Sequence, residues 1–158
     1  MGAGKSTVGR LLAEALDRPF VDADTAIEEH AEMPIPEIFS RKGELWFRRM
    51  EERIIRDIVA GPAGVIALGG GALGRERTRG LLGRVAQVVW LRLDPEAAWE
   101  RVAGSDRPLA GERERFLRRG AQREPIYREC ADITVDATAH PRDTTTAIVA
   151  ALEEASAS

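Results

Sequence analysis

The chain has 158 residues, 44% of them hydrophobic, which suits one compact domain with a real core and leaves no room for a second. A formal net charge of -3 gives no strong field of either sign, which argues against a nucleic-acid or membrane surface. Cys130 is the only cysteine, which excludes an intrachain disulfide framework and fits a reducing compartment. The first residues carry no leader pattern, and no apolar run reaches the ~18 residues of a membrane span. We therefore expect a single domain over residues 1–158, cytoplasmic and monomeric, with no nucleic-acid or membrane partner.

Short apolar runs alternate with longer helical patterns along the chain. The runs 20–22, 65–68, 85–93 and 133–135 are short and partly β-branched, as buried parallel strands tend to be. Each is followed by residues whose apolar positions repeat every three or four, as in an amphipathic helix. Because parallel strands need long crossover connections, the alternation predicts an α/β fold with a parallel sheet flanked by helices.

The helical patterns also predict which faces are buried. The first helix should pack on the sheet through Val8, Leu11, Leu12, Ala15 and Leu16, and the last through Ile148, Val149 and Leu152. The segment 44–59 should bury one apolar stripe, made of Phe47, Met50, Ile54 and Ile58. Its charged residues are expected on the other faces, namely Glu51, Glu52, Arg53, Arg56 and Asp57. The charge-rich segment 105–115, with Pro108 and Gly111, is expected to leave the packed body as a short lid.

The N-terminal residues contain the second half of a phosphate-binding loop, whose full pattern is G-x-x-x-x-G-K-[ST]. Gly4, Lys5 and Ser6 match its end, and an amphipathic helix follows. Glycines allow backbone amides to turn toward phosphate oxygens, Lys5 would reach the β and γ phosphates, and Ser6 would ligate Mg²⁺. The alternative is a glycine-rich segment with Ser6 as a helix N-cap. The position before an amphipathic helix favours the phosphate site.

The first glycine of the loop and the strand before it are absent, since the sequence starts at Met1. In folds of this kind that strand lies in the middle of the sheet. Its loss would leave backbone groups unpaired and would remove buried apolar area. We therefore expect that Met1 is an internal methionine, and that about ten residues with an apolar strand precede it in the native protein. The intact mass of the native protein tests this expectation.

The run 20–22 ends in an Asp-x-Asp pair, Asp22 and Asp24. Two carboxylates at the carboxyl end of a strand can hold the water shell of Mg²⁺ and orient an acceptor hydroxyl. Asp24 fits equally well as the N-cap of a helix that begins near Thr25. Taken alone, the pair favours the capping interpretation of Asp24.

Further elements follow in a characteristic order. They are Ile38-Phe39, Gly43-Glu44, Phe47-Arg48 with Glu51, Leu68-Gly69-Gly70-Gly71-Ala72, Arg107-Pro108-Leu109, Arg123-Glu124-Pro125-Ile126-Tyr127 and Ala131-Asp132. Across nearly the whole chain this series resembles the shikimate kinase family. The resemblance implies a three-layer P-loop kinase fold with five parallel strands, of which the first is missing here. It also implies transfer of the γ-phosphate of ATP to the 3-hydroxyl of shikimate, a step of chorismate and aromatic amino acid biosynthesis.

On the nucleotide side, the resemblance implies that the phosphate loop binds ATP through Gly2, Ala3, Gly4, Lys5, Ser6 and Thr7. Lys5 and Arg107 are the implied catalytic cations, with Arg107 reaching the phosphates from the lid. Arg101 and Pro141 are implied to sandwich the adenine. Ser6 and Asp22 are the implied Mg²⁺ site, where Asp22 acts mostly through metal-bound water.

On the acceptor side, the helical region 25–60 is implied to cover shikimate, and the implied binding residues are Asp24, Arg48, Gly69, Gly70, Gly71 and Arg123. Asp24 would face the acceptor hydroxyl and act in catalysis. Arg48 and Arg123 would bind the carboxylate, a task that suits the planar, bidentate guanidinium group. The glycines would bring backbone close to the ring, although a mobile turn is the other interpretation of three glycines in a row.

Two other functions remain open from the sequence. One is a different small-molecule kinase on the same scaffold, such as a gluconate kinase, which would also use Lys5 and Ser6. The other is a nucleotide-binding module without catalysis, which the incomplete phosphate loop suggests. The remaining conspicuous residues are assigned to packing or to solvent: Trp46, Trp90, Trp99, His30, His140, Cys130 and most arginines of 113–128.

Overall fold

The computed structural model describes residues 2–103 and 113–157 of the chain. Helices and strands alternate within these ranges. In chain order they are α1 (Lys5–Ala15), β1 (Phe20–Asp22), α2 (Ala23–Ala31), α3 (Ile35–Val59), β2 (Val65–Ala67), η1 (Ala72–Gly74, a 3-10 turn), α4 (Glu76–Val85), β3 (Val89–Arg92), α5 (Pro95–Val102), α6 (Arg113–Cys130), β4 (Ile133–Asp136) and α7 (Pro141–Ser156). Arg107 and positions 105–112 of the predicted lid lie outside the described residues, and positions 113–115 form the first turn of α6.

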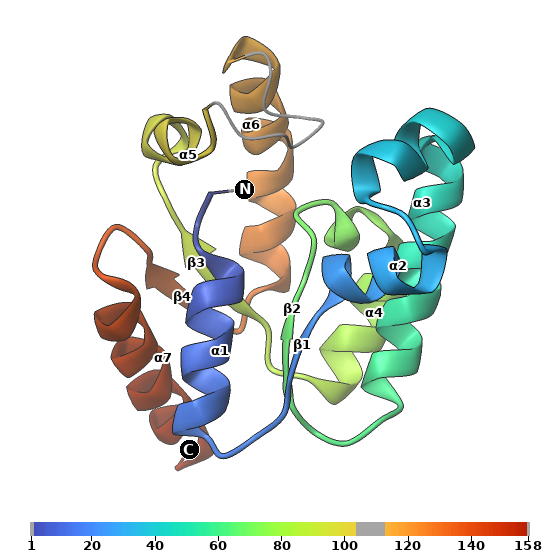
Figure 1. Cartoon of the computed structure of the whole chain (residues 1–158). Helices are drawn as coiled ribbons and strands as arrows, with labels where there is room; N and C mark the ends of the chain where they lie inside the picture. The colour runs from blue at the N-terminus through green and yellow to red at the C-terminus, as the bar shows by residue number, and fades with distance from the viewer. Residues whose placement is uncertain (1, 104–112, 158) are drawn as a thin grey trace.

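The strands pair in parallel, as predicted. β1 lies beside β2, with Phe20 opposite Val65, and β3 lies beside β4, with Val89 opposite Ile133. In the described part of the chain these are two separate two-stranded sheets, which Figure 1 shows side by side. No described strand lies between β2 and β3 to join their backbone groups into one sheet.

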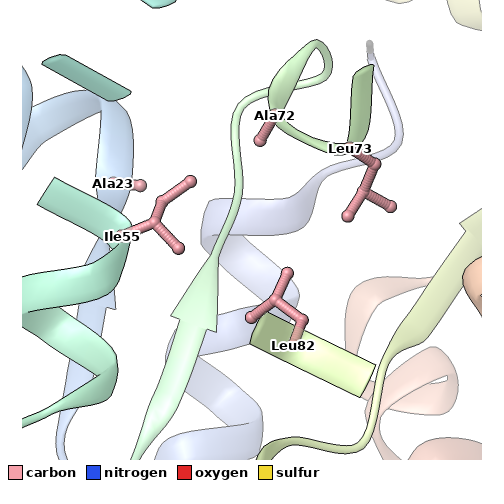
Figure 2. Packing of buried hydrophobic residues seen from close by; sticks show 5 residues of the cluster. All are labelled: Ala23, Ile55, Ala72, Leu73 and Leu82. Atoms are coloured by element: carbon pink, nitrogen blue, oxygen red, sulfur yellow. The ribbon is translucent and has the colours of Figure 1, made fainter. Parts of the chain in front are cut away.

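Helices cover the strands on two sides and give three layers. On one side α1 packs along α7 (Figure 1), and Val8, Leu12 and Ile148 form a buried cluster there. The strands contribute Val65, Val89, Leu91 and Val135 to this cluster. On the other side α3 and α4 form a second core, with buried side chains from Ala23, Ile55, Ala72, Leu73 and Leu82 (Figure 2). The predicted α/β architecture with flanking helices is confirmed.

The prediction that a strand covers all of 85–93 is wrong at its start. Val85 is the last residue of α4, where it is 58% exposed. The amide of Ala86 donates to the carbonyl of Leu82 at 3.0 Å and closes the helix, and the strand begins only at Val89. Only Gln87 interrupts the apolar residues between the helix end and the strand, so hydropathy alone does not mark the boundary.

The helix predicted over 44–59 is the second part of α3, which continues from Ile35 through a kink at Gly43. Gly43 has φ 82°, a conformation that an L side chain rarely adopts, and this residue therefore marks the kink. The buried residues of the second part are Phe47, Glu51 and Ile55. The expectation that Glu51 faces solvent is therefore wrong, because its side chain lies on the buried stripe at one-turn spacing from Phe47 and Ile55.

The prediction that Leu16 packs on the sheet is wrong, because it is the C-cap residue of α1 and is 36% exposed. The tryptophans and Cys130 are packed as the sequence indicated. The Trp90 ring lies 6.0 Å from the Tyr127 ring, and the Trp99 ring lies 5.4 Å from the Phe116 ring. Trp46 packs against the cluster around Ile27 and Ile38. Cys130 is partly buried. Over residues 2–103 and 113–157, the structure contains no helix with the length and apolar character needed to cross a membrane.

Replacing Ile55 by Ala tests the second core. Ile55 is 0% exposed and lies in the cluster of Figure 2, so Ile55→Ala removes three buried carbons and leaves a cavity. We expect the free energy of unfolding in urea to fall by about 2–5 kcal/mol. Leu45, which is 61% exposed, supplies the control, and Leu45→Ala should change the same quantity by less than ~0.5 kcal/mol. Equal losses in the two variants would contradict this assignment of the core.

Candidate active site

The phosphate loop turns directly into α1. Gly2 and Gly4 have φ 73° and 74°, and Gly4 is the N-cap residue of α1. A Cβ on Gly2 would lie 2.6 Å from the carbonyl oxygen of Ala98, so the loop packs closely on α5. The first amides of α1 have no partner within the helix, and with the helix dipole they form an anion-binding end. Ser6 is therefore not the N-cap, and that alternative is wrong.

Asp22 joins this loop to the start of α2. The Ser6 hydroxyl donates to Oδ2 of Asp22 at 2.5 Å. Oδ1 of Asp22 accepts from the amides of Asp24 at 3.0 Å and Thr25 at 3.4 Å. Asp22 is therefore the N-cap of α2, and the proposed cap at Asp24 is wrong because the helix already begins at Ala23. The hydroxyl and the carboxylate predicted to serve Mg²⁺ lie side by side.

Asp24 and Glu51 meet at Gly69. A Cβ on Gly69 would lie 2.7 Å from Oδ1 of Asp24 and 2.8 Å from Oε1 of Glu51. A Cβ at this position would require both carboxylates to shift, so glycine lets them keep the positions they have here. The loop after β2 thus brings an acid from α2 and an acid from α3 to one point.

Arg48 fills the space beside Gly71. A Cβ on Gly71 would lie 2.6 Å from Cζ of Arg48. Nη1 of Arg48 donates to Oε2 of Glu51 at 2.8 Å, and the two side chains are 15% and 1% exposed. The ion pair is therefore largely removed from water, where charge attraction is weakly screened.

Glu51 is the buried acid of the site. Burial raises the pKa of Glu51 above its usual value of 4.5, while Arg48 opposes this shift and Asp24 adds to it. Its second oxygen, Oε1, is buried and has no hydrogen-bond partner among the described residues. An unsatisfied buried oxygen beside Asp24 is a place where a ligand hydroxyl can donate.

Arg123 and Tyr127 close the site from α6. The Tyr127 hydroxyl donates to the carbonyl oxygen of Gly70 and is also hydrogen-bonded to Arg123. Burial raises the pKa of Tyr127. Burial also lowers the pKa of Arg123, and the positive charge of Arg48 contributes to that shift. Both arginines predicted to bind a carboxylate therefore belong to one cluster around the three glycines.

The residues predicted to bind adenine, Arg101 and Pro141, lie away from this cluster, on α5 and at the start of α7. Nη1 of Arg101 on α5 donates to the carbonyl of Ala137 at 3.1 Å, and Nη2 donates to Thr138 at 3.5 Å. Pro141 begins α7 a few residues further on. The structure brings Arg101 to the loop before Pro141, and their role toward adenine stays a prediction. Arg107 lies outside the described residues.

Sequence reasoning did not single out Glu51 or Tyr127 as site residues. For Glu51 the signal was present, since it lies one turn from Phe47 and one turn from Ile55, both of them buried. For Tyr127 the signal was its position one turn after Arg123 on the same helix.

A phosphate loop at a helix N-terminus, a Ser–Asp pair beside it and a buried cluster of arginines and carboxylates are the features of the P-loop kinase fold class. The family model described as shikimate kinase matches residues 1–153. The chain belongs to the shikimate kinase family.

Relatives and solved structures agree with this membership. The shikimate kinase of Nitrobacter winogradskyi is 51% identical, over 85% of this chain and 64% of the relative. That of Bradyrhizobium diazoefficiens is 45% identical, over 90% of this chain and 70% of the relative. The chain thus spans about two thirds of the length of these relatives. The solved structure of the Acinetobacter baumannii shikimate kinase in complex with shikimate matches this chain with a TM-score of 0.94 at 34% identity. The match covers 98% of this chain and 89% of the solved chain. The solved Aquifex aeolicus shikimate kinase matches with a TM-score of 0.87 at 31% identity. This match covers 99% of this chain and 94% of the solved chain.

The raised pKa of Glu51 predicts a pH-dependent difference between the protein and Glu51→Gln. The folded pKa lies above the unfolded value, so the stability from this group is fully present below pH 4.5 and is lost as pH rises through the folded pKa. We expect the unfolding free energy of the protein to fall relative to that of Glu51→Gln over that window. Urea unfolding of both proteins from pH 4 to pH 8 measures the difference. A constant difference across this range would contradict a raised pKa.

Proposed function

We propose that this protein is a shikimate kinase, which transfers the γ-phosphate of ATP to the 3-hydroxyl of shikimate. The observation that carries the proposal is the convergence of Arg48, Arg123, Asp24 and Glu51 on the glycines after β2. These groups match an acceptor with one carboxylate and several hydroxyls, since guanidinium groups bind the carboxylate and carboxylates accept from hydroxyls. The solved relative from Acinetobacter baumannii is a complex with shikimate, which supports the same acceptor here.

The nucleotide belongs at the phosphate loop. ATP phosphates would accept from the first amides of α1, and Lys5 would neutralise charge that develops during transfer. Arg107 is proposed to add a second cation. Arg101 and Pro141 are proposed to hold the adenine, because both belong to the α5–α7 side of the fold.

Mg²⁺ fits beside Ser6 and Asp22. Their oxygens lie 2.5 Å apart at the N-terminus of α1, and oxygen ligands are those that Mg²⁺ prefers. The described residues contain no group of three or more His, Cys, Asp or Glu that could hold a metal by themselves. This small donor set suits Mg²⁺, which keeps several waters and binds substrate phosphates. When bound, the ion supplies positive charge to the β and γ phosphates.

Asp24 is the proposed group that faces the acceptor hydroxyl. Its amide donates to Asp22, which accepts from Ser6 next to the phosphate loop, and its carboxylate lies beside Glu51 at Gly69. From there it can accept the proton of the attacking hydroxyl and keep that oxygen directed toward the nucleotide. The Arg48–Glu51 pair fixes the neighbouring side chains. We further propose that the protein acts in the cytoplasm as a monomer, with shikimate as its partner and with no nucleic acid or membrane.

A coupled assay of ADP release tests the proposed function. We expect turnover with ATP, Mg²⁺ and shikimate, and none when EDTA removes the metal. Because the relatives are longer than this chain, the assay uses this chain and a form extended upstream of Met1. Gluconate in place of shikimate is the control. Turnover of gluconate alone would favour another kinase on this scaffold. Binding of shikimate without turnover by either form would favour an inactive module.

Asp24→Asn tests the proposed role of this carboxylate. Since Asn cannot take a proton, kcat should fall by about 100- to 10,000-fold, while shikimate still binds through the arginines. Steady-state kinetics measure kcat, and calorimetry without nucleotide measures binding. Asp57→Asn, which changes an exposed carboxylate on α3, is the matched control and should leave kcat unchanged. A kcat for Asp24→Asn within twofold of the parent value would rule out this role.

A further inference from the structure

Arg119, on α6, carries a buried nitrogen with no partner. Nη1 of Arg119 and Oε1 of Glu51 are the buried side-chain atoms without a hydrogen bond among the described residues. A guanidinium group keeps its charge at any physiological pH, so Nη1 cannot lower its cost by losing a proton. Native proteins rarely leave such a donor unsatisfied, which indicates that a ligand supplies the acceptor.

The position of Arg119 on α6 directs it toward the acceptor site. Arg119, Arg123 and Tyr127 follow one another at one-turn spacing, so they lie along one face of the helix. Tyr127 contacts Gly70, and Arg123 lies within electrostatic reach of Arg48 and Glu51. The charge of Arg119 acts on Arg123, as expected for neighbours on that face.

Three other arginines of α6 differ from Arg119 and Arg123 because they are exposed and paired with acids. Arg113, Arg118 and Arg128 pair with Glu96, Glu114 and Glu124, and their side chains are 58%, 66% and 72% exposed. Neither Arg119 nor Arg123 forms a salt bridge within the described residues. Two partly buried cations therefore lie one turn apart with no acid between them, and their repulsion is relieved when an anion binds to both.

We propose that Arg119 is a further substrate-binding residue, which together with Arg123 donates to the carboxylate of the acceptor. This inference rests on the proposed shikimate kinase function. The location of Arg119 favours a carboxylate over a phosphoryl group as its ligand. Helix α6 packs against η1 and α5, and its Tyr127 contacts the three-glycine loop of the proposed acceptor site. The proposed phosphate site is elsewhere, at the N-terminus of α1, where Ser6 and Asp22 lie. The two oxygens of one carboxylate can accept from two guanidinium groups at the same time.

Arg119→Leu tests the inference through the kinetics of the active form. We expect KM for shikimate to rise about tenfold, which corresponds to about 1.4 kcal/mol, with kcat and KM for ATP changed by less than about twofold. Arg119→Lys keeps the charge and should recover part of the loss. Arg118→Leu is the matched control, because Arg118 is exposed and paired with Glu114, and it should leave all three constants unchanged.

The methyl ester of shikimate separates the carboxylate from the phosphoryl group. Since the ester lacks the charge, the parent protein and Arg119→Leu should have the same KM for it. A rise in KM for ATP, or a fall in kcat with unchanged KM for shikimate, would place Arg119 at the phosphates and overturn the proposal. An equal rise in KM for shikimate and for its ester would overturn it as well.

Thermal melting distinguishes binding from a structural role. Removing an unsatisfied charge beside Arg123 should leave Tm of the ligand-free protein equal or higher, while the rise in Tm on adding shikimate should shrink. A lower ligand-free Tm for both Arg119→Leu and Arg119→Lys would mean a structural role and would overturn the proposal. If the parent protein neither binds nor turns over shikimate, the proposed function itself fails. If it does both and Arg119→Leu behaves identically, only the inference fails.

Discussion

The buried ion pair between Arg48 and Glu51 fixes the arrangement of the acceptor site. Glu51 is 1% exposed, and its charge is acceptable there because Arg48 donates to it at 2.8 Å. Removing one partner of such a pair costs about 3–5 kcal/mol, since the other charge is then left uncompensated. The pair lies against Gly69 and Gly71, where a Cβ would require its side chains to shift. The glycines after β2 thus leave the space that these charged side chains occupy.

Asp22 is the second point on which the site depends. It ends β1, caps α2 and accepts from Ser6 in the first turn of α1. One carboxylate therefore connects the phosphate loop to the helix that carries Asp24. Asp22 ends β1, and the three glycines follow the end of β2. Parallel α/β sheets bind ligands at this edge, where their strands end. The residues predicted for the nucleotide and for the acceptor come close together because two neighbouring strands end at the same edge.

Sequence reasoning selected several residues from short motifs, and their roles toward ligands stay predictions. The glycines and Ser6 of the phosphate loop, Asp22 and the three glycines after β2 were all found by pattern. It failed for Glu51, because patterning assigns charged residues to the surface and cannot show that Arg48 lies within reach. It also placed Val85 in a strand although that residue ends α4, and it offered Asp24 as the α2 cap where the structure has Asp22.

The sequence by itself determined the alternation of strands and helices, the family, and the residue types of the predicted nucleotide and acceptor sites. These features are local, or are read from motifs whose residues stand close together in the chain. Only the tertiary structure decided that Glu51 is buried, that Tyr127 reaches Gly70, and that Arg119 carries an unpartnered nitrogen. The physical reason is that burial and charge pairing depend on which helices pack against one loop, and sequence spacing does not fix contacts between distant segments.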